Sequence, residues 1–199
     1  MKIILLLISL VSSIFALTIN ESMIKVHSVL VPKILLMDYR IQDKITKSTM
    51  KIVIAYNDSE YKYAKSLKNR IDSRYKDGIK SYNISTKLVL YKNINNTKAN
   101  LYYLFPTSKE NIKSTIKQAH KNDALTFSYL KDDLQYGVMI SLNISKKIKT
   151  VLNLDAIKKY KISLRPVLIE ISTIYKTSTN KLPSRLNVIK YNFYTIYTA

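Results

Sequence analysis

The chain has 199 residues, of which 33 are Lys or Arg and 13 are Asp or Glu, so its formal net charge at pH 7 is +20. It contains no cysteine and only two glycines, which excludes disulfides, a thiol-based redox switch and a glycine-rich phosphate loop. This length suits one domain with a substantial buried core and is too short for two comfortable ones.

The first sixteen residues have the pattern of a secretory signal peptide. Lys2 gives a positive start, residues 3–11 form an apolar run, and Ala16 closes a mostly small-residue exit. The apolar run is too short to span a bilayer comfortably. We therefore expect export and removal of residues 1–16, with an uncleaved membrane anchor as the alternative because Ile14 is bulkier than the residue usually preferred there.

The next segments alternate between helix and strand patterns. Residues 21–37 carry apolar residues at helical spacing, and Pro32 should kink or shorten this helix. A continuous apolar run at 52–56 predicts a strand buried on both faces. Residues 61–75 form a Lys-rich amphipathic pattern that ends near Gly78, where a helix C-terminus is favoured.

The middle of the chain repeats this scheme. Residues 88–91 and 101–105 have strand patterns separated by a polar turn segment. Thr107 and Glu110 have the spacing of a capping box, which predicts the start of another helix, and residues 125–129 follow as a strand. Alternating strands and helices predict a single α/β domain over residues 17–176, with a mixed, partly parallel sheet flanked by helices.

The last part of this domain predicts a hairpin followed by a helix. Residues 138–152 form two strands that should pair antiparallel. Ser163 is positioned to cap the final helix, and Pro166 is tolerated in its first turn. The helix is expected to point one apolar stripe into the core. This stripe consists of Leu164, Val167, Leu168, Ile171 and Tyr175.

In order and spacing, residues 136–172 resemble the C-terminal part of the YfiR-like (YfiR/HmsC-like) family of periplasmic proteins. There a Gly-Gly-Met-Ile-type strand precedes a second strand, an Asn-Leu-x-Ala step and a Ser-x-x-Leu-Leu helix. Tyr136 replaces the first glycine of that pattern in this chain. The matching segments are Gly137-Val138-Met139-Ile140, Asn153-Leu154-Asp155-Ala156 and Ser163 to Leu168.

The resemblance implies a regulatory protein rather than an enzyme. Members of the family are periplasmic and tend to dimerise. The best understood members restrain an inner-membrane diguanylate cyclase by binding its periplasmic sensor domain, and release raises cyclic-di-GMP and promotes biofilm. By analogy, we expect this chain to restrain a diguanylate cyclase or a sensor histidine kinase without any cofactor. The alternative is a periplasmic protein that binds a small solute and delivers it to a transporter or receptor.

Three residues of the family pattern are candidate site residues. Gly137 opens a strand, where a missing side chain permits a bulge, a close backbone approach or a simple turn. Asn153 stands where strand gives way to helix and is expected to cap that helix, a structural role. Arg165 is unusual in a first helical turn because the helix dipole disfavours a cation there. A salt bridge, or contact with an anion or a partner, would explain it.

Catalytic and metal-binding arrangements are absent from the sequence pattern. The two histidines, His27 and His120, are interpreted as packing or solvated residues. No spacing typical of a zinc site occurs, and no histidine is placed to activate a serine. Asp132 and Asp133 are expected in a solvated loop, with a hydrolase that uses them as a third alternative. We therefore predict no catalytic residue, no metal and no cofactor.

The charge and the C-terminal segment complete the predictions. Most basic residues are Lys spread along the whole chain, which argues against nucleic-acid binding and favours at most a weak contact with anionic lipid. Residues 177–184 form a polar linker, and residues 186–197 are rich in β-branched and aromatic side chains. The latter segment predicts an extra strand at the sheet edge or a strand that pairs with a partner.

Overall fold

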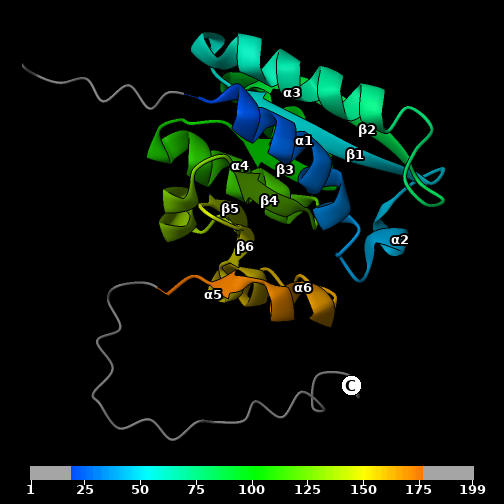
Figure 1. Cartoon of the computed structure of the whole chain (residues 1–199), viewed down its shortest axis with the longest axis vertical. Helices are drawn as coiled ribbons and strands as arrows, with labels where there is room; N and C mark the ends of the chain where they lie inside the picture. Colours follow the sequence, from blue (N-terminus) through cyan, green and yellow to red (C-terminus); the bar gives the residue numbers. More distant parts are fainter. Residues whose placement is uncertain (1–18, 177–199) are drawn as a thin grey trace, which may run out of the picture.

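The computed structural model describes residues 19–176. The predicted signal peptide at 1–16 and the predicted linker and strand at 177–199 lie outside these residues. Seven strands form one sheet in the order β2-β1-β3-β4-β5-β6-β7 (Figure 1). The strands are β1 Thr49–Tyr56, β2 Asn83–Leu90, β3 Leu101–Leu104, β4 Leu125–Ser128, β5 Ile140–Ile144, β6 Ile148–Leu152 and β7 Thr173–Ile174.

The sheet is mostly parallel. Strands β2, β1, β3, β4 and β5 run parallel to their neighbours, β6 is antiparallel to β5, and β7 is parallel to β6. The order 2-1-3-4-5 is that of doubly wound α/β sheets, in which the chain reverses its direction of travel between β1 and β3. The predicted α/β fold with a mixed sheet and an antiparallel hairpin is confirmed.

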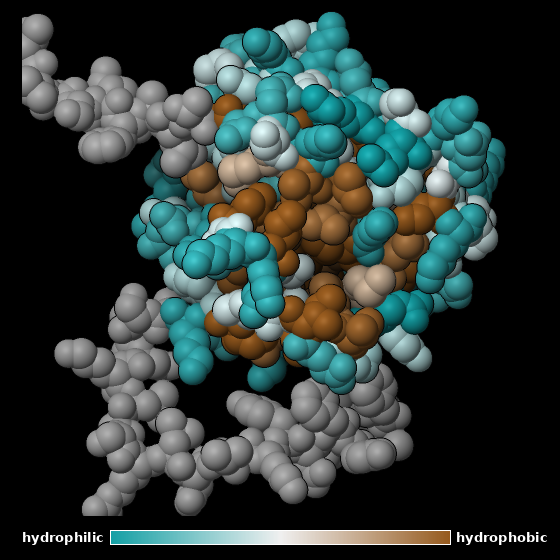
Figure 2. Space-filling view, in the orientation of Figure 1, coloured by the Kyte–Doolittle hydropathy of each residue, from teal (hydrophilic) through white to brown (hydrophobic). Residues whose placement is uncertain are grey.

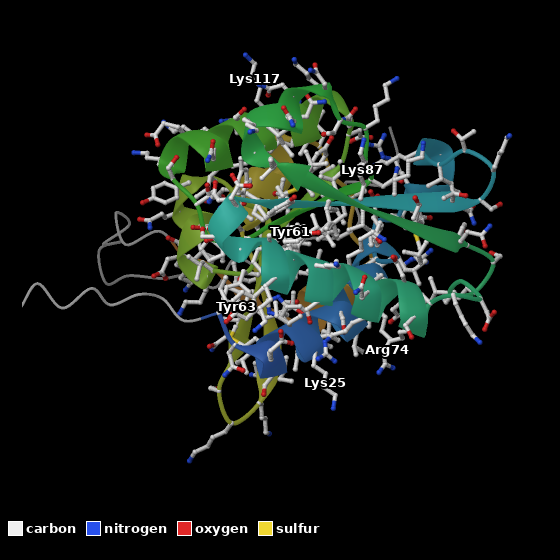
Figure 3. The ribbon with its side chains drawn as sticks, turned by 90° about the horizontal axis from the view of Figure 1, so that it is seen from above. Lys25, Tyr61, Tyr63, Arg74, Lys87 and Lys117 are labelled. Atoms are coloured by element: carbon white, nitrogen blue, oxygen red, sulfur yellow. The ribbon has the colours of Figure 1, made fainter. Side chains whose placement is uncertain are left out.

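Helices lie on both faces of the sheet (Figures 1 and 3). Helices α1 and α3 cover one face, while α4, η4 and η5 pack on the opposite face. The helices are α1 Glu21–Leu35, α2 Ile41–Lys44, η3 Asp58–Glu60, α3 Tyr61–Arg74, η4 Tyr91–Asn96, α4 Lys109–Lys121, η5 Lys131–Tyr136, α5 Leu154–Lys159 and α6 Pro166–Ile171. None of these described helices has the length and apolar composition that a bilayer crossing requires.

Strand β1 shows how the sheet divides the core. Successive side chains of a strand point to opposite faces. Ile52 and Ile54 therefore join the cluster beneath α1 and α3, whereas Val53 and Ala55 join the cluster beneath α4. Both pairs are buried, which explains why this segment reads as a continuous apolar run rather than an alternating one.

The connection from β4 to β5 leaves part of the α1 face open. This crossover contains only the short η5, whose Leu134 packs in the cluster on the α4 face. Across the sheet from α1 toward β7, the face that carries α1 is therefore not covered again within residues 19–176 until the far end, where α5 and α6 follow β6 (Figure 1). A gap between α1 and α6 results.

Two helix starts differ from the predictions. Ser108, not the pair Thr107 and Glu110, caps α4, because the Ser108 hydroxyl accepts a hydrogen bond from the Asn111 N–H at 3.4 Å. Helix α6 begins at Pro166 with Arg165 as its N-cap residue and without a side-chain cap. The predicted cap of α6, Ser163, instead accepts a main-chain hydrogen bond from Tyr39 at 2.7 Å.

Candidate docking site: an apolar hollow between α1 and α6

Helix α1 has an apolar flank that α3 does not cover. On its α3 side, the Glu21 carboxylate pairs with the Arg70 guanidinium at 3.3 Å. At 3.6 residues per turn, Met23, Val26 and Leu30 lie on the opposite flank. All three are only partly buried against the core. This flank faces the gap in the helical layer.

Helix α6 forms the other wall and exposes apolar side chains. Leu168 is buried, but Val167 is 52% exposed and Ile171 is 65% exposed. The prediction that these residues form a core stripe is therefore wrong for Val167 and Ile171. Helix α6 has only six residues, less than two turns, and the core covers only the side that carries Leu168. The prediction is also wrong for Tyr175, which lies after β7 and not in the helix, and packs against the cluster on the α4 face.

Strand β5 supplies the floor between the two helices. Ile140 and Leu142 belong to the cluster on the α1 face. The same face continues along the hairpin, because Ile144 pairs with Ile148 and side chains two residues apart share a face. Ile144 is 36% exposed and Ile148 is 48% exposed. Apolar surface thus extends from the buried floor to the end of the hairpin.

Figure 2 shows the result as a sunken apolar surface beside α1, continuing across α6 and bordered by hydrophilic side chains. We name it the α1–α6 hollow. We define it by Met23, Val26, Leu30, Ile140, Leu142, Val167 and Ile171. Contiguous exposed apolar surface of this kind marks an interaction site more often than single exposed apolar residues do.

The hairpin between β5 and β6 gives the hollow a basic border. Its loop projects from the sheet on the side that carries α1 (Figure 3). Residues 143–149 contain Lys146, Lys147 and Lys149, all exposed, and no acidic residue. An approaching surface with acidic groups around an apolar centre would match this distribution of charge.

Arg165 fixes α6 to the end of α1. Its main-chain N–H donates to the Met37 carbonyl at 2.8 Å, and its Nε donates to the Leu36 carbonyl at 3.3 Å. The guanidinium also lies over the Tyr39 ring, 5.8 Å from the centroid. Together with the hydrogen bond from Tyr39 to Ser163, these contacts form a clamp that closes one end of the hollow. The contacts found for Arg165 are with carbonyls and a ring, rather than a carboxylate.

Gly137 and Asn153 meet at one carbonyl group. The Asn153 side-chain amide donates to the Leu134 carbonyl at 2.8 Å, and the Gly137 N–H donates to the same oxygen at 3.1 Å. Asn153 also accepts from the Ala156 N–H at 3.0 Å, so it caps α5 as predicted. Gly137 has a φ of +101°, whereas a Cβ there would meet only Ile116 at 3.6 Å. The backbone conformation therefore favours glycine at this position, whereas the space around it would accommodate a Cβ atom.

His27 lies beneath α1 among aromatic rings. Its Nδ1 is 2.7 Å from the Tyr103 hydroxyl, and the rings of Phe127 and Tyr129 lie beside it. Its Nε2 has no hydrogen-bond partner. Burial lowers the pKa of the imidazole to about 4, because the charged form would lose its hydration. The ring is neutral at neutral pH and acts as a packing residue, as predicted.

Asp133 is buried and does not lie in a solvated loop. Its carboxylate accepts a hydrogen bond from the Ser128 hydroxyl at 2.5 Å, and burial raises its pKa. The expectation of a solvated pair is therefore wrong for Asp133, whereas Asp132 is exposed. Within η5, Asp132 points to solvent, whereas Asp133 and Leu134 are buried. Residues 19–176 contain no group of three or more His, Cys, Asp or Glu side chains placed to hold a metal ion.

The sequence pattern of the YfiR/HmsC-like family matches residues 42–173. The chain belongs to this family. The match includes Gly137, Asn153 and Arg165, and it contains β5 and α6, the floor and one wall of the hollow. Helix α1, the opposite wall, precedes it. No curated protein matches the chain.

Solved structures resemble this YfiR/HmsC-like protein in fold. A conserved domain protein from Vibrio cholerae superposes with a TM-score of 0.55 at 15% sequence identity, over 77% of this chain and 60% of that one. A domain from Streptococcus pneumoniae, in complex with L-Trp, superposes with a TM-score of 0.46 at 10% identity, over 71% of this chain and 60% of that one. The chain thus spans about three fifths of each structure, and the first likeness supports the α/β fold.

The crevice where doubly wound sheets usually bind ligands is occupied by the YfiR/HmsC-like chain itself. This crevice lies at the carboxyl ends of β1 and β3. There the Asn57 side-chain amide donates to the Pro106 carbonyl at 3.2 Å, and the Asn57 N–H donates to Glu60 at 3.1 Å. The Tyr91 hydroxyl donates to the Phe105 carbonyl at 2.6 Å. These internal bonds use polar groups that would otherwise be available to a solute.

Proposed function

We propose that this protein is a non-enzymatic periplasmic regulator. It binds and restrains the periplasmic sensor domain of an inner-membrane signalling protein, either a diguanylate cyclase or a sensor histidine kinase. The α1–α6 hollow is its docking surface. Membership of the YfiR/HmsC-like family supports the class of function. The observation that carries the choice of surface is the exposure of Val167 and Ile171 on α6 beside the hollow.

The apolar area is sufficient for a regulatory contact. Fully burying one exposed side chain of this size contributes about 1.5 to 3 kcal/mol. Because Val167 is 52% exposed and Ile171 is 65% exposed, the two together offer about 2 to 3.5 kcal/mol before the costs of association. A useful switch needs only about 1 to 3 kcal/mol of difference in affinity between two conformations of the partner. The protein restrains its partner by binding the inactive conformation more tightly.

The border of the hollow defines the chemistry of the partner. Lys146, Lys147 and Lys149 favour a partner with acidic residues around an apolar ridge. Arg165 stands at the clamped end, where its exposed guanidinium is available to an acidic group of that partner in addition to holding α6. Gly137 and Asn153 contribute indirectly, because they set the start of β5 and the end of β6.

Two weaker associations belong to the same proposal. The net charge of +20 favours contact with anionic lipid head groups at the inner membrane, where the partner resides. A homodimer, which the family resemblance implies, is the second association. Neither association involves nucleic acid.

Crosslinking in the cell tests the proposal. A photoactivatable residue placed at position 171 should attach the protein to an inner-membrane cyclase or kinase, identified by mass spectrometry. The matched control places the same residue at Lys117, which is exposed on α4 on the opposite face (Figure 3). Attachment from position 171 and not from position 117 is the expected result. Equal attachment from both positions, or capture only of a transporter subunit from position 171, would contradict the proposal.

A second test follows the output of the partner. The double variant Val167→Ser, Ile171→Ser should remain folded and lose at least about tenfold in affinity for the partner, since about 1.4 kcal/mol corresponds to a factor of ten. If the partner is a cyclase, cellular cyclic-di-GMP should rise. A matched variant, Lys117→Ser, should leave the output unchanged. An unchanged output in the double variant would argue against the hollow as the docking surface.

A further inference from the structure

The α1–α6 hollow lies near the point where the chain leaves the described residues. Strand β7 begins two residues after the last residue of α6, and Ile174 of β7 pairs with Leu152 of β6. The N–H of Tyr175 continues this pairing by donating to the Leu152 carbonyl at 2.8 Å. The chain is therefore fixed to the sheet beside α6 up to this residue, and 23 further residues follow Lys176.

The segment that follows has the composition of a buried one. Residues 186–197 include eight apolar or aromatic side chains among twelve, and Lys190 is their single charge. The eight are Leu186, Val188, Ile189, Tyr191, Phe193, Tyr194, Ile196 and Tyr197. Residues 19–176 leave one concave apolar surface uncovered beside α6, and it is the α1–α6 hollow (Figure 2). An apolar segment and an apolar surface on one chain each gain by covering the other.

The linker is long enough for this contact. Residues 177–185 are nine in number and reach at most about 30 Å when extended. Helix α6 has six residues and is about 9 Å long. A helix with its side chains is about 10 Å across, so the far wall at α1 also lies within this reach. Tethering of this kind gives an effective concentration in the millimolar range.

We infer that residues 186–197 dock in the α1–α6 hollow of their own chain and are its resident occupant. The segment covers Val167 and Ile171 and removes their exposed apolar surface from water. Under the proposed function, on which only this last step rests, a signalling partner must displace the segment before it binds.

Thiol labelling tests the docking without any partner. The chain has no cysteine, so Ile171→Cys introduces a single reporter at an exposed position of α6. The reference background also carries Ile189→Ser, Phe193→Ser and Ile196→Ser, which remove apolar side chains from the segment. With the native segment, the thiol should react with a polar maleimide about tenfold more slowly than in this background, because the docked segment must first open locally. A second reporter, Val26→Cys, should show the same change at the opposite wall.

Two controls make the result specific. The background Asn187→Ser, Asn192→Ser, Thr195→Ser alters only polar residues of the segment and should keep position 171 protected. A reporter at Lys117→Cys on α4 should react equally in all backgrounds. Equal labelling of position 171 in the native and apolar-substituted backgrounds would overturn the inference, as would an added strand at the β7 edge that leaves this position reactive.

Concentration dependence separates docking within one chain from docking between two. Protection of position 171 should be independent of protein concentration if the segment belongs to the same chain. Protection that disappears on dilution would overturn the inference in favour of a second copy as the occupant. The labelling tests and the crosslinking test are independent. A negative labelling result would overturn the docking of the segment but not the proposed function, because crosslinking measures attachment to a membrane protein.

Discussion

Helices α3 and α6 lie on the same face of the sheet, yet they use their apolar residues differently. In α3, Ala64, Leu67 and Ile71 are all completely buried. In α6, Leu168 is buried while Val167 and Ile171 remain exposed. Both helices show an amphipathic pattern in the sequence. The comparison teaches that such a pattern identifies an apolar stripe but does not say whether the described domain covers it.

The largest effect should come from the buried stripe of α3. We expect Leu67→Ala to lower the free energy of unfolding by about 3 kcal/mol, because it leaves a cavity in a fully packed region. Urea denaturation followed by circular dichroism measures the change. The matched truncation on α6, Val167→Ala, should cost less than about 0.5 kcal/mol when it is made in the background with Ile189→Ser, Phe193→Ser and Ile196→Ser, which leaves Val167 exposed. Similar losses in the two variants would remove the distinction between the two helices.

The next effect concerns the layer between α1 and the sheet, where His27 is buried. Its pKa is about 4 in the folded protein and 6.5 in the unfolded chain. The unfolded state therefore takes up a proton first as the pH falls, and stability is lost between these two values. We expect a loss of about 2 kcal/mol from this group between about pH 7 and pH 4.5.

His27→Phe provides the control for this pH dependence. It removes the titrating group, so the variant should lose about 2 kcal/mol less than the native protein over the same pH interval. Contributions from Asp133, whose raised pKa acts in the opposite direction, cancel in this difference. Equal pH dependence in both proteins would mean that the imidazole is not buried in its neutral form.

A pair of glycines extends the comparison to the two ends of the sheet. Gly137, before β5, has positive φ but open space, so Gly137→Ala should cost about 1 kcal/mol of stability. Gly78, after α3, also has positive φ, and a Cβ there would lie 2.5 Å from the Tyr82 carbonyl oxygen. Gly78→Ala should therefore cost more than Gly137→Ala by thermal denaturation. The reverse order would contradict the packing described around α3.

The smallest effect on stability should come from the hollow itself. In the background that carries Ile189→Ser, Phe193→Ser and Ile196→Ser, where the segment no longer covers α6, we expect Val167→Ser and Ile171→Ser to change the free energy of unfolding by less than about 0.5 kcal/mol each, because both side chains are exposed in the described domain. Partner affinity should nevertheless fall, as proposed above. A loss of several kcal/mol on unfolding would instead assign both residues to a core.

Much of the fold could be predicted from local pattern because the signals are strong and repeated. The buried run in β1, the Lys-rich helix α3 and the hairpin of β5 and β6 each have an unambiguous periodicity. The predicted helix at 21–37 is confirmed as α1, which contains Pro32 and ends at Leu35. The two-residue β7 was not predicted, since so short a strand has no periodicity of its own.

The candidate site was less accessible to this reasoning. Val167 and Ile171 have helical spacing, and nothing in that spacing distinguishes a covered helix from an uncovered one. The clamp at Arg165 depends on Leu36 and Met37, which are distant in sequence. Asp133 was misassigned because its hydrogen bond with Ser128 requires the folded position of η5 against β4. Only the capping role of Asn153 followed from local sequence alone.

The clamp between Arg165 and the end of α1 also governs when the hollow comes into existence. The hydrogen bond from Arg165 to Leu36 joins residues 129 positions apart. Both walls are therefore assembled only after nearly the whole domain has emerged and folded, since contacts of high sequence separation form late. A chain interrupted before α6 would have a sheet but no second wall. Loss of the C-terminal part of the domain would therefore remove the hollow while leaving the strands that precede α6.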